Sequence, residues 1–193
     1  MRQIEPKMIA FIDKKLAGNG AAALAIAQKD ARSVFVYAAE ACVGIREEGG
    51  NNKGPLVELI QETLGGADRE AWCMAFMQTC LAYAEVKTGV KSPVHASEHC
   101  LTVWKQSPEA QRVKKFPARG AIIIWQHGST SNGHTGVFLE AQDDGGMRAI
   151  EGNAERGLAA DGSVEREGGG VYLTSRSMKA NGTMKVVGWL KPF

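Results

Sequence analysis

Hydrophobic residues recur with helical spacing through the first part of the chain. Three or four residues separate most members of the first set, which are Ile4, Met8, Ile9, Ile12 and Leu16. This spacing predicts an amphipathic helix over residues 4–16 that ends at Gly18-Asn19-Gly20. A second helix is predicted over residues 21–42. We expect both helices to pack on their own domain, although such faces also occur in membrane-active or partner-binding segments.

Glycine and proline divide the middle of the chain. The glycine- and asparagine-rich residues 49–54 indicate a loop, and a short helix is predicted over residues 55–64. A further helix is predicted from Cys73 to about Lys87, because an apolar run follows Gly65-Gly66 and Gly89 closes it. Ser92-Pro93 fits an N-cap followed by a first helical position, which predicts a helix reaching about residue 105.

After Pro117 the pattern changes to short apolar runs that are typical of strands. They cover residues 121–125, 135–141, 147–151, 171–175 and 185–190. Asp143-Asp144-Gly145-Gly146 predicts the turn between the second and third runs, and the glycine-rich, charged residues 157–170 predict a mobile loop. Helices followed by an antiparallel sheet indicate an α+β fold rather than alternating βαβ units.

Composition and charge narrow the function classes. The 193 residues contain 44% hydrophobic and 23% charged residues, which suits a single globular domain. The net charge of +2 is too small for the concentrated basic face of a nucleic-acid-binding protein. No apolar run approaches the roughly 20 residues that span a membrane. Residues 21–27 make a poor signal-peptide core after Asp13 and Lys14, so we expect synthesis in the cytoplasm without an export signal.

Four cysteines raise the question of disulfides. In one helix, Cys73 and Cys80 would lie roughly 10 Å apart, whereas the Cα atoms of a disulfide normally lie within about 7 Å. Cys42 and Cys100 could pair only if the fold brought them together. We therefore expect buried thiols, with Cys42, Cys80 and Cys100 serving stability.

The sequence Glu70-Ala71-Trp72-Cys73-Met74-Ala75-Phe76-Met77 places a cysteine at the start of a predicted helix. The positive end of the helix dipole lowers the pKa of a thiol there and favours the nucleophilic thiolate. An arbitrary cysteine is more often a small buried hydrophobe. The residues downstream favour the catalytic interpretation, because Gly133-His134 offers a base and Glu151-Gly152-Asn153 offers groups to orient it.

His134 is the strongest of the candidate bases. It begins a strand between Gly133 and Gly136, which permits close backbone approach, whereas His127 lies in a polar loop. His95 and His99 fall on the helix predicted after Ser92-Pro93.

Strand geometry leaves more than one candidate for the group that orients the imidazole. A tight turn at Asp144-Gly145 would place Glu155 opposite His134 and Glu151 opposite Phe138, although bulges shift such registers. Glu151 and Asn153 would share one strand face, so both could address the imidazole.

These residues together resemble the CHAP family of cysteine, histidine-dependent amidohydrolases and peptidases. Residues 48–54 are similar to the segment that precedes the nucleophile in such domains. Residues 166–172 and Val187-Gly188-Trp189 resemble the closing strands of phage-type and wall-hydrolase members. The family often has aspartate where this chain has Ala121. The resemblance covers about residues 38–193, so we expect this range to be the catalytic domain and residues 1–37 to be a helical extension packed on it.

The resemblance implies a papain-like fold and cleavage of an amide bond in peptidoglycan, by an amidase or an endopeptidase. It implies catalysis by Cys73, His134, Glu151 and Asn153, and it favours Glu151 over Glu155. We expect no cofactor and no metal, because the spacing of Glu62, Asp68 and Glu70 is not that of a calcium loop. We expect the backbone N–H of Cys73 to donate to the oxyanion. We further expect a monomeric phage endolysin that reaches the bacterial wall after release; a wall-degrading antibacterial effector is the alternative.

Two other classes stay open. His95-Ala96-Ser97-Glu98-His99 fits the H-x-x-E-H pattern of inverted zinc peptidases, but no third ligand on a separate helix is evident. A non-catalytic wall-binding or structural protein could keep the same fold, although the intact Cys73 and His134 argue against it.

Overall fold

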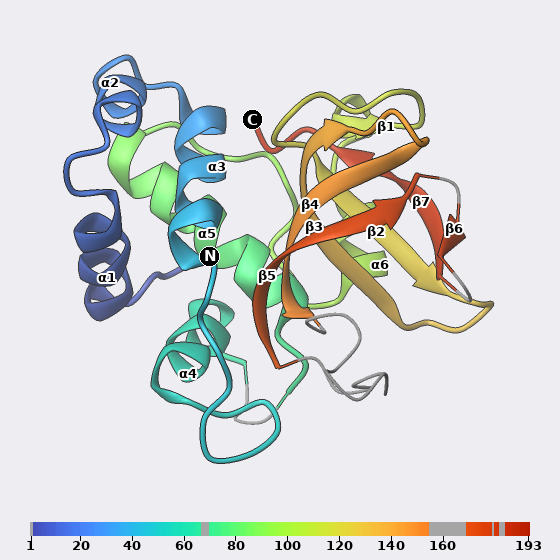
Figure 1. Cartoon of the computed structure of the whole chain (residues 1–193), viewed down its shortest axis with the longest axis horizontal. Coiled ribbons are helices and arrows are strands. Elements are labelled where there is room, and N and C mark those ends of the chain that lie inside the picture. Colours follow the sequence, from blue (N-terminus) through green and yellow to red (C-terminus); the bar gives the residue numbers. More distant parts are fainter. Residues whose placement is uncertain (1, 67–69, 155–168, 179, 182–183) are drawn as a thin grey trace.

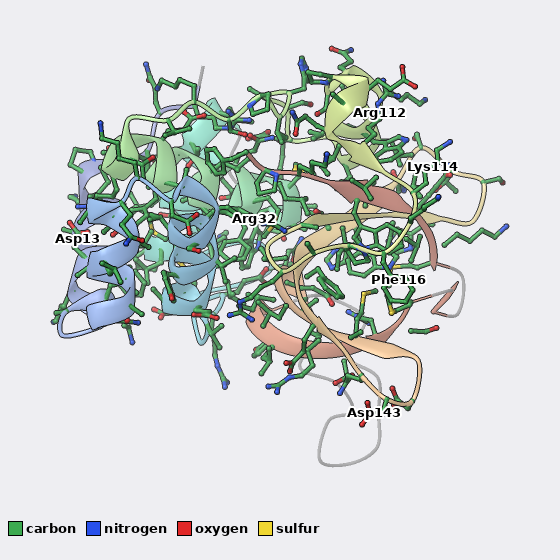
Figure 2. All side chains as sticks on the ribbon, turned by 90° about the horizontal axis from the view of Figure 1, so that it is seen from above. Asp13, Arg32, Arg112, Lys114, Phe116 and Asp143 are labelled. Carbon is green, nitrogen blue, oxygen red and sulfur yellow. The ribbon has the colours of Figure 1, made fainter. Side chains whose placement is uncertain are left out.

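Most of the helices and the sheet occupy separate halves of the molecule. The computed structural model describes residues 2–66, 70–154, 169–178, 180–181 and 184–193, and Figure 1 shows most of the helices on one side and the sheet on the other, with one short helix beside the sheet. In Figure 2, Asp13 on the helical side and Asp143 at the tip of a strand hairpin lie at opposite ends of the molecule. The α+β class predicted from the sequence is confirmed.

The helices follow most of the predicted pattern. They are α1 (Pro6–Leu16), α2 (Gly20–Ala27), α3 (Ala31–Cys42), α4 (Pro55–Gln61) with a 3-10 turn (Glu62–Leu64), α5 (Cys73–Thr88) and α6 (Cys100–Gln106). The single helix predicted over residues 21–42 is wrong. Lys29 adopts a left-handed conformation (φ 56°), and the side chain of Asp30 then caps α3 by accepting a hydrogen bond from the Ser33 N–H (3.1 Å).

The helix predicted from Ser92 is also wrong over its first two turns, because α6 begins only at Cys100. The Ser92 hydroxyl donates to the carbonyl of Pro192 (2.6 Å) and accepts from the Val94 N–H (3.2 Å), which makes a local turn instead of a helix cap. His95 and His99 therefore do not lie on a helix.

The predicted strands correspond to the long strands of one antiparallel sheet. Its elements are β1 (Arg112–Val113), β2 (Ile122–His127), β3 (Gly133–Ala141), β4 (Gly146–Ala154), β5 (Gly170–Ser177), β6 (Ala180–Asn181) and β7 (Met184–Leu190). The order is β1-β7-β2-β3-β4-β5, and β6 pairs with β7. The two-residue strands β1 and β6 were not predicted. Most of the loop predicted over residues 157–170 lies outside the described residues.

Helix α5 joins the two halves. It contacts α3 on one side and β3 and β4 on the other, and most of its side chains are buried. Ile122 and Ile124 of β2 belong to the main core with the helices, whereas Ile123 and Trp125 belong to a second cluster on the opposite face of the sheet. Burial on both faces explains the continuous apolar run of this strand.

Two further sequence expectations concern the whole chain. No helix among the described residues is both long and apolar enough to cross a bilayer. The division between residues 37 and 38 remains a prediction, and α3 runs through this position.

Candidate active site

Cys73 is the first residue of α5, as predicted. Its side chain is almost fully buried, with 7% exposure, and the backbone N–H of Met74 donates to its sulfur. One turn further along α5, Phe76 packs against Gly152 of β4, where a Cβ would lie 2.6 Å from the Phe76 ring. The glycine of the Glu-Gly-Asn sequence therefore lets α5 lie directly on β4, which brings Cys73 to the sheet.

His134 lies on β3 and is framed by close backbone contacts. Its ring stacks on the Trp125 ring of β2, with centroids 5.7 Å apart and an interplanar angle of 24°. A Cβ on Gly133 would lie 2.7 Å from the Trp125 carbonyl, and one on Gly136 would lie 2.8 Å from Cγ of Glu151. The close approach predicted for these two glycines is thus confirmed.

Glu151 is the carboxylate that meets the imidazole. Its side chain is fully buried, and Oε2 lies 2.8 Å from Nε2 of His134. Nε and Nη2 of Arg176 donate to Oε1 and Oε2 at 2.9 and 2.7 Å, and the Thr174 hydroxyl also donates to Oε1. Because Glu151 engages Nε2, the ring nitrogen available to the thiol of Cys73 is Nδ1.

These contacts favour a chain of alternating charges. Burial alone would lower the pKa of His134, but its hydrogen bonds with Cys73 and Glu151 raise it to about 10. Burial would raise the pKa of Glu151, but hydrogen bonds from His134 and Arg176 lower it to about 2. A hydrogen bond from Cys100 and the contact with His134 hold the pKa of Cys73 well below its ordinary value, against the effect of burial. The site thus favours thiolate, imidazolium, carboxylate and guanidinium in sequence.

The residue pairing predicted across the β3–β4 hairpin from a tight turn at Asp144-Gly145 is wrong. The turn has three residues rather than two, because the Gln142 N–H donates to the Gly146 carbonyl (2.8 Å), and the register then shifts between Phe138 and Glu140. Phe138 consequently pairs with Ala149 and not with Glu151. Glu155 lies outside the described residues. Bulges of this kind leave no clear signal in the alternating pattern.

Asn153 does not continue a regular strand. Its φ is 50°, and the pairing of β4 with β5 shifts between Glu151 and Ala154, so the simple alternation that would place Asn153 on the Glu151 face is interrupted. Extending the register three residues beyond the Val137–Ile150 pair places Asn153 level with His134. The site role of Asn153 remains a prediction.

An open groove of about 830 Å³ borders the candidate site at Cys73. Its walls include Cys73, Cys100, His127, Asn132 and Gly133. His127, predicted to be a loop histidine, is the last residue of β2 and lines the groove. Cys73 thus lies in the wall of the groove.

Three neighbours of the site were missed by the sequence analysis. Arg176 and Thr174 alternate on β5 and so share a face, but their pairing with β4 is a long-range contact that the sequence does not encode locally. Cys100 was assigned only a structural role, yet its sulfur lies 3.9 Å from the sulfur of Cys73. The possible Cys42–Cys100 disulfide does not form, and each of the chain's four cysteines, all of them described, is a buried free thiol.

The premise of the zinc alternative is not met. Residues 95–99 are irregular rather than helical, so the H-x-x-E-H spacing does not place two histidines on one helical face. Within the part of the chain that the structure describes, no three histidine, cysteine or acidic side chains are grouped as metal ligands.

Comparison with known proteins gives one match, to a family model. Residues 65–153 match the family model described as the CHAP domain. No curated protein and no solved structure matches the chain. The matched segment contains Cys73, His134, Glu151 and Asn153. Residues 65–153 are therefore similar to the CHAP domain, a domain of amidase- and peptidase-type hydrolases.

Proposed function

We propose that this protein is a peptidoglycan hydrolase that cuts an amide bond of the wall peptide, as an amidase or an endopeptidase. The observation that carries the proposal is the Cys73–His134–Glu151 chain at the wall of an open groove. A thiolate held beside an imidazolium attacks a carbonyl carbon without a separate deprotonation step. Amidases and endopeptidases use the same machinery, so both remain within the proposal.

The proposed reaction proceeds in two stages. The sulfur of Cys73 attacks the amide carbonyl, and the Cys73 N–H at the start of α5 donates to the developing oxyanion. His134 then gives its proton to the leaving amine, which leaves an acyl group joined to Cys73 as a thioester. Water, deprotonated by His134, releases the acyl group as a carboxylate and restores the thiolate. Glu151 orients the imidazole, and Asn153 polarises it.

Arg176 keeps Glu151 ionised in this scheme. Glu151 is fully buried, and an isolated buried carboxyl group would take up a proton. Two hydrogen bonds from the guanidinium, with the Thr174 hydroxyl, hold the charge in place. Arg176 is thus a positioning residue, because it acts on the reaction only through Glu151.

We expect Arg176→Ala to move the acid limb of the kcat/KM profile to higher pH. Loss of the cation raises the pKa of Glu151, so a higher pH is needed to ionise it, and a close opposite charge typically changes a carboxyl pKa by about 1–3 units. Arg176→Lys should restore part of the shift. Arg148→Ala is the matched control, because Arg148 pairs with the exposed Glu140 (3.2 Å). An unchanged acid limb in Arg176→Ala would exclude this role.

We expect iodoacetamide to abolish lysis of purified peptidoglycan, with Cys73 as the labelled residue. The thiolate of Cys73 lines the groove, whereas Cys42 and Cys80 are fully buried and should remain unlabelled under native conditions. Lysis should persist in excess EDTA, since a chelator leaves a thiol–imidazole pair intact. Activity that is lost in EDTA, restored by zinc and indifferent to alkylation would contradict the proposal.

In its biological setting we propose a monomeric phage endolysin that reaches the wall after release from the cytoplasm. This part of the proposal rests on the resemblance of the segments around residues 166–172 and 187–189 to the closing strands of phage-type and wall-hydrolase members of the CHAP family. Sedimentation analysis tests whether the protein is a monomer in solution.

A further inference from the structure

The sulfur atoms of Cys73 and Cys100 touch at the wall of the groove. They lie 3.9 Å apart, and each cysteine is the first residue of its helix, α5 or α6. A disulfide has an S–S distance of about 2.05 Å, so closing the gap requires a movement of roughly 2 Å. Side-chain torsions with small backbone adjustments supply movements of this size.

The surroundings hold Cys100 against the nucleophile. A Cβ on Gly133 would lie 2.8 Å from Cβ of Cys100, so β3 packs directly behind the Cys100 side chain. Leu101, Val103 and Trp104 anchor α6 in the core. Cys100 is only 4% exposed, but it shares the groove wall with Cys73, so a small molecule in the groove would lie beside both residues.

We propose that Cys73 and Cys100 form a reversible disulfide when the protein meets a low-molecular-weight disulfide such as oxidised glutathione. The bond removes the nucleophile of the proposed hydrolase, and this consequence alone rests on the proposed function. It also shields Cys73 from the irreversible sulfinic and sulfonic acid stages of oxidation.

The reaction consists of two thiol–disulfide exchanges. The Cys73 thiolate attacks one sulfur of the oxidant, forms a mixed disulfide and expels the first thiolate of the oxidant. The Cys100 thiol then loses its proton and attacks the sulfur of Cys73 in that mixed disulfide, which expels the second thiolate. Two protein thiol groups are oxidised and one oxidant disulfide is reduced. The proton of Cys100 leaves on one of the two released thiols.

The electrostatics set the order of the two steps. The hydrogen bond to Cys73, burial and the negative charge of Cys73 all raise the pKa of Cys100, so Cys100 stays a neutral thiol while Cys73 is a thiolate. Formation of the mixed disulfide at Cys73 removes that negative charge. Cys100 then loses its proton more easily, at the moment when it must act as the nucleophile.

Cys42 and Cys80 provide an internal control. They also lie close enough to interact with each other, and burial is the main cause that raises the pKa of the Cys80 thiol. Both side chains are 0% exposed, and neither is among the residues of the groove wall. An oxidant in the groove therefore reaches Cys73 and not this second pair.

The test is intact-mass analysis of the native chain after incubation with oxidised glutathione. We expect wild type to lose two hydrogens and retain no glutathione, whereas Cys100→Ser should retain one glutathione on Cys73. The double variant Cys42→Ser/Cys80→Ser should still lose two hydrogens. Trypsin separates the candidates, because Cys73 and Cys80 lie in peptide 70–87, Cys100 in peptide 92–105 and Cys42 in peptide 33–46.

A cross-link between peptides 70–87 and 92–105, with fragmentation placing it at Cys73, supports the inference. A cross-link to peptide 33–46 would overturn the inference, and so would a wild-type protein that retains glutathione on Cys73. Peptide mapping of the wild type decides between these outcomes even if a variant fails to fold. Lysis should disappear on oxidation and return with dithiothreitol. If the reduced protein lyses no wall at all, the proposed function fails, while the mass measurement still decides the disulfide.

Discussion

Replacing Cys73 with alanine is expected to abolish wall lysis while the protein stays folded. The side chain lost is small, and the helix that carries it is held by the deeply buried Phe76 and Met77 one turn further along. The thiol itself supplies the bond to the acyl group, so its loss removes the nucleophile of the proposed reaction. Cys73→Ser should also be inactive, because a hydroxyl is not ionised by this imidazole.

The measurement is the loss of turbidity of purified walls, with circular dichroism to confirm folding. Cys80→Ser is the matched control, because Cys80 is a buried cysteine of the same helix that lies away from the groove. It should lower stability while keeping lysis. Lysis by Cys73→Ala at the wild-type rate would contradict the proposed mechanism.

Replacing Glu151 with glutamine is expected to lower turnover by at least ~10²-fold, in line with losing support for a general acid–base group. Glutamine keeps the shape of the side chain but removes the charge that stabilises the imidazolium. The pKa of His134 should then fall from about 10. The pH range in which thiolate and imidazolium coexist ends at the pKa of His134, so this range should narrow from its alkaline side.

The pH dependence of the rate at which Cys73 is alkylated measures the thiolate–imidazolium pair of Cys73 and His134 independently of turnover. Glu140→Gln is the control, because Glu140 is an exposed strand glutamate paired with Arg148. Asn153→Ala should also lower turnover by at least ~10²-fold, and Glu155→Ala should remain near wild type. A strong loss in Glu155→Ala with an active Glu151→Gln would mean that the wrong carboxylate has been assigned.

The candidate site was most predictable where its signals were local. The glycine break before Cys73 and the apolar run after it predicted the start of α5, and the glycines beside His134 predicted a close backbone approach. Both features depend on backbone conformations that neighbouring residues determine. The resemblance of the Glu-Gly-Asn sequence, rather than geometry, then selected Glu151.

The errors arose where distant contacts decide the structure. Counting from the turn failed because a three-residue turn and a bulge each moved the register of β3 and β4. Extending a helix back to Ser92 placed Cys100 inside it and hid the fact that Cys100 begins α6 beside Cys73. The contact of Arg176 with Glu151 depends on the β4–β5 pairing, which joins segments about 25 residues apart.

The central claim is that Cys73 cuts an amide bond of peptidoglycan. Its most direct test is mass spectrometry of the fragments that wild type and Cys73→Ala release from purified peptidoglycan in ¹⁸O-labelled water. We predict that wild type releases fragments with one new amine and one new carboxylate, with a single ¹⁸O in that carboxylate, and that Cys73→Ala releases none. Fragments cut at glycosidic bonds, or the same amide products from Cys73→Ala, would contradict it.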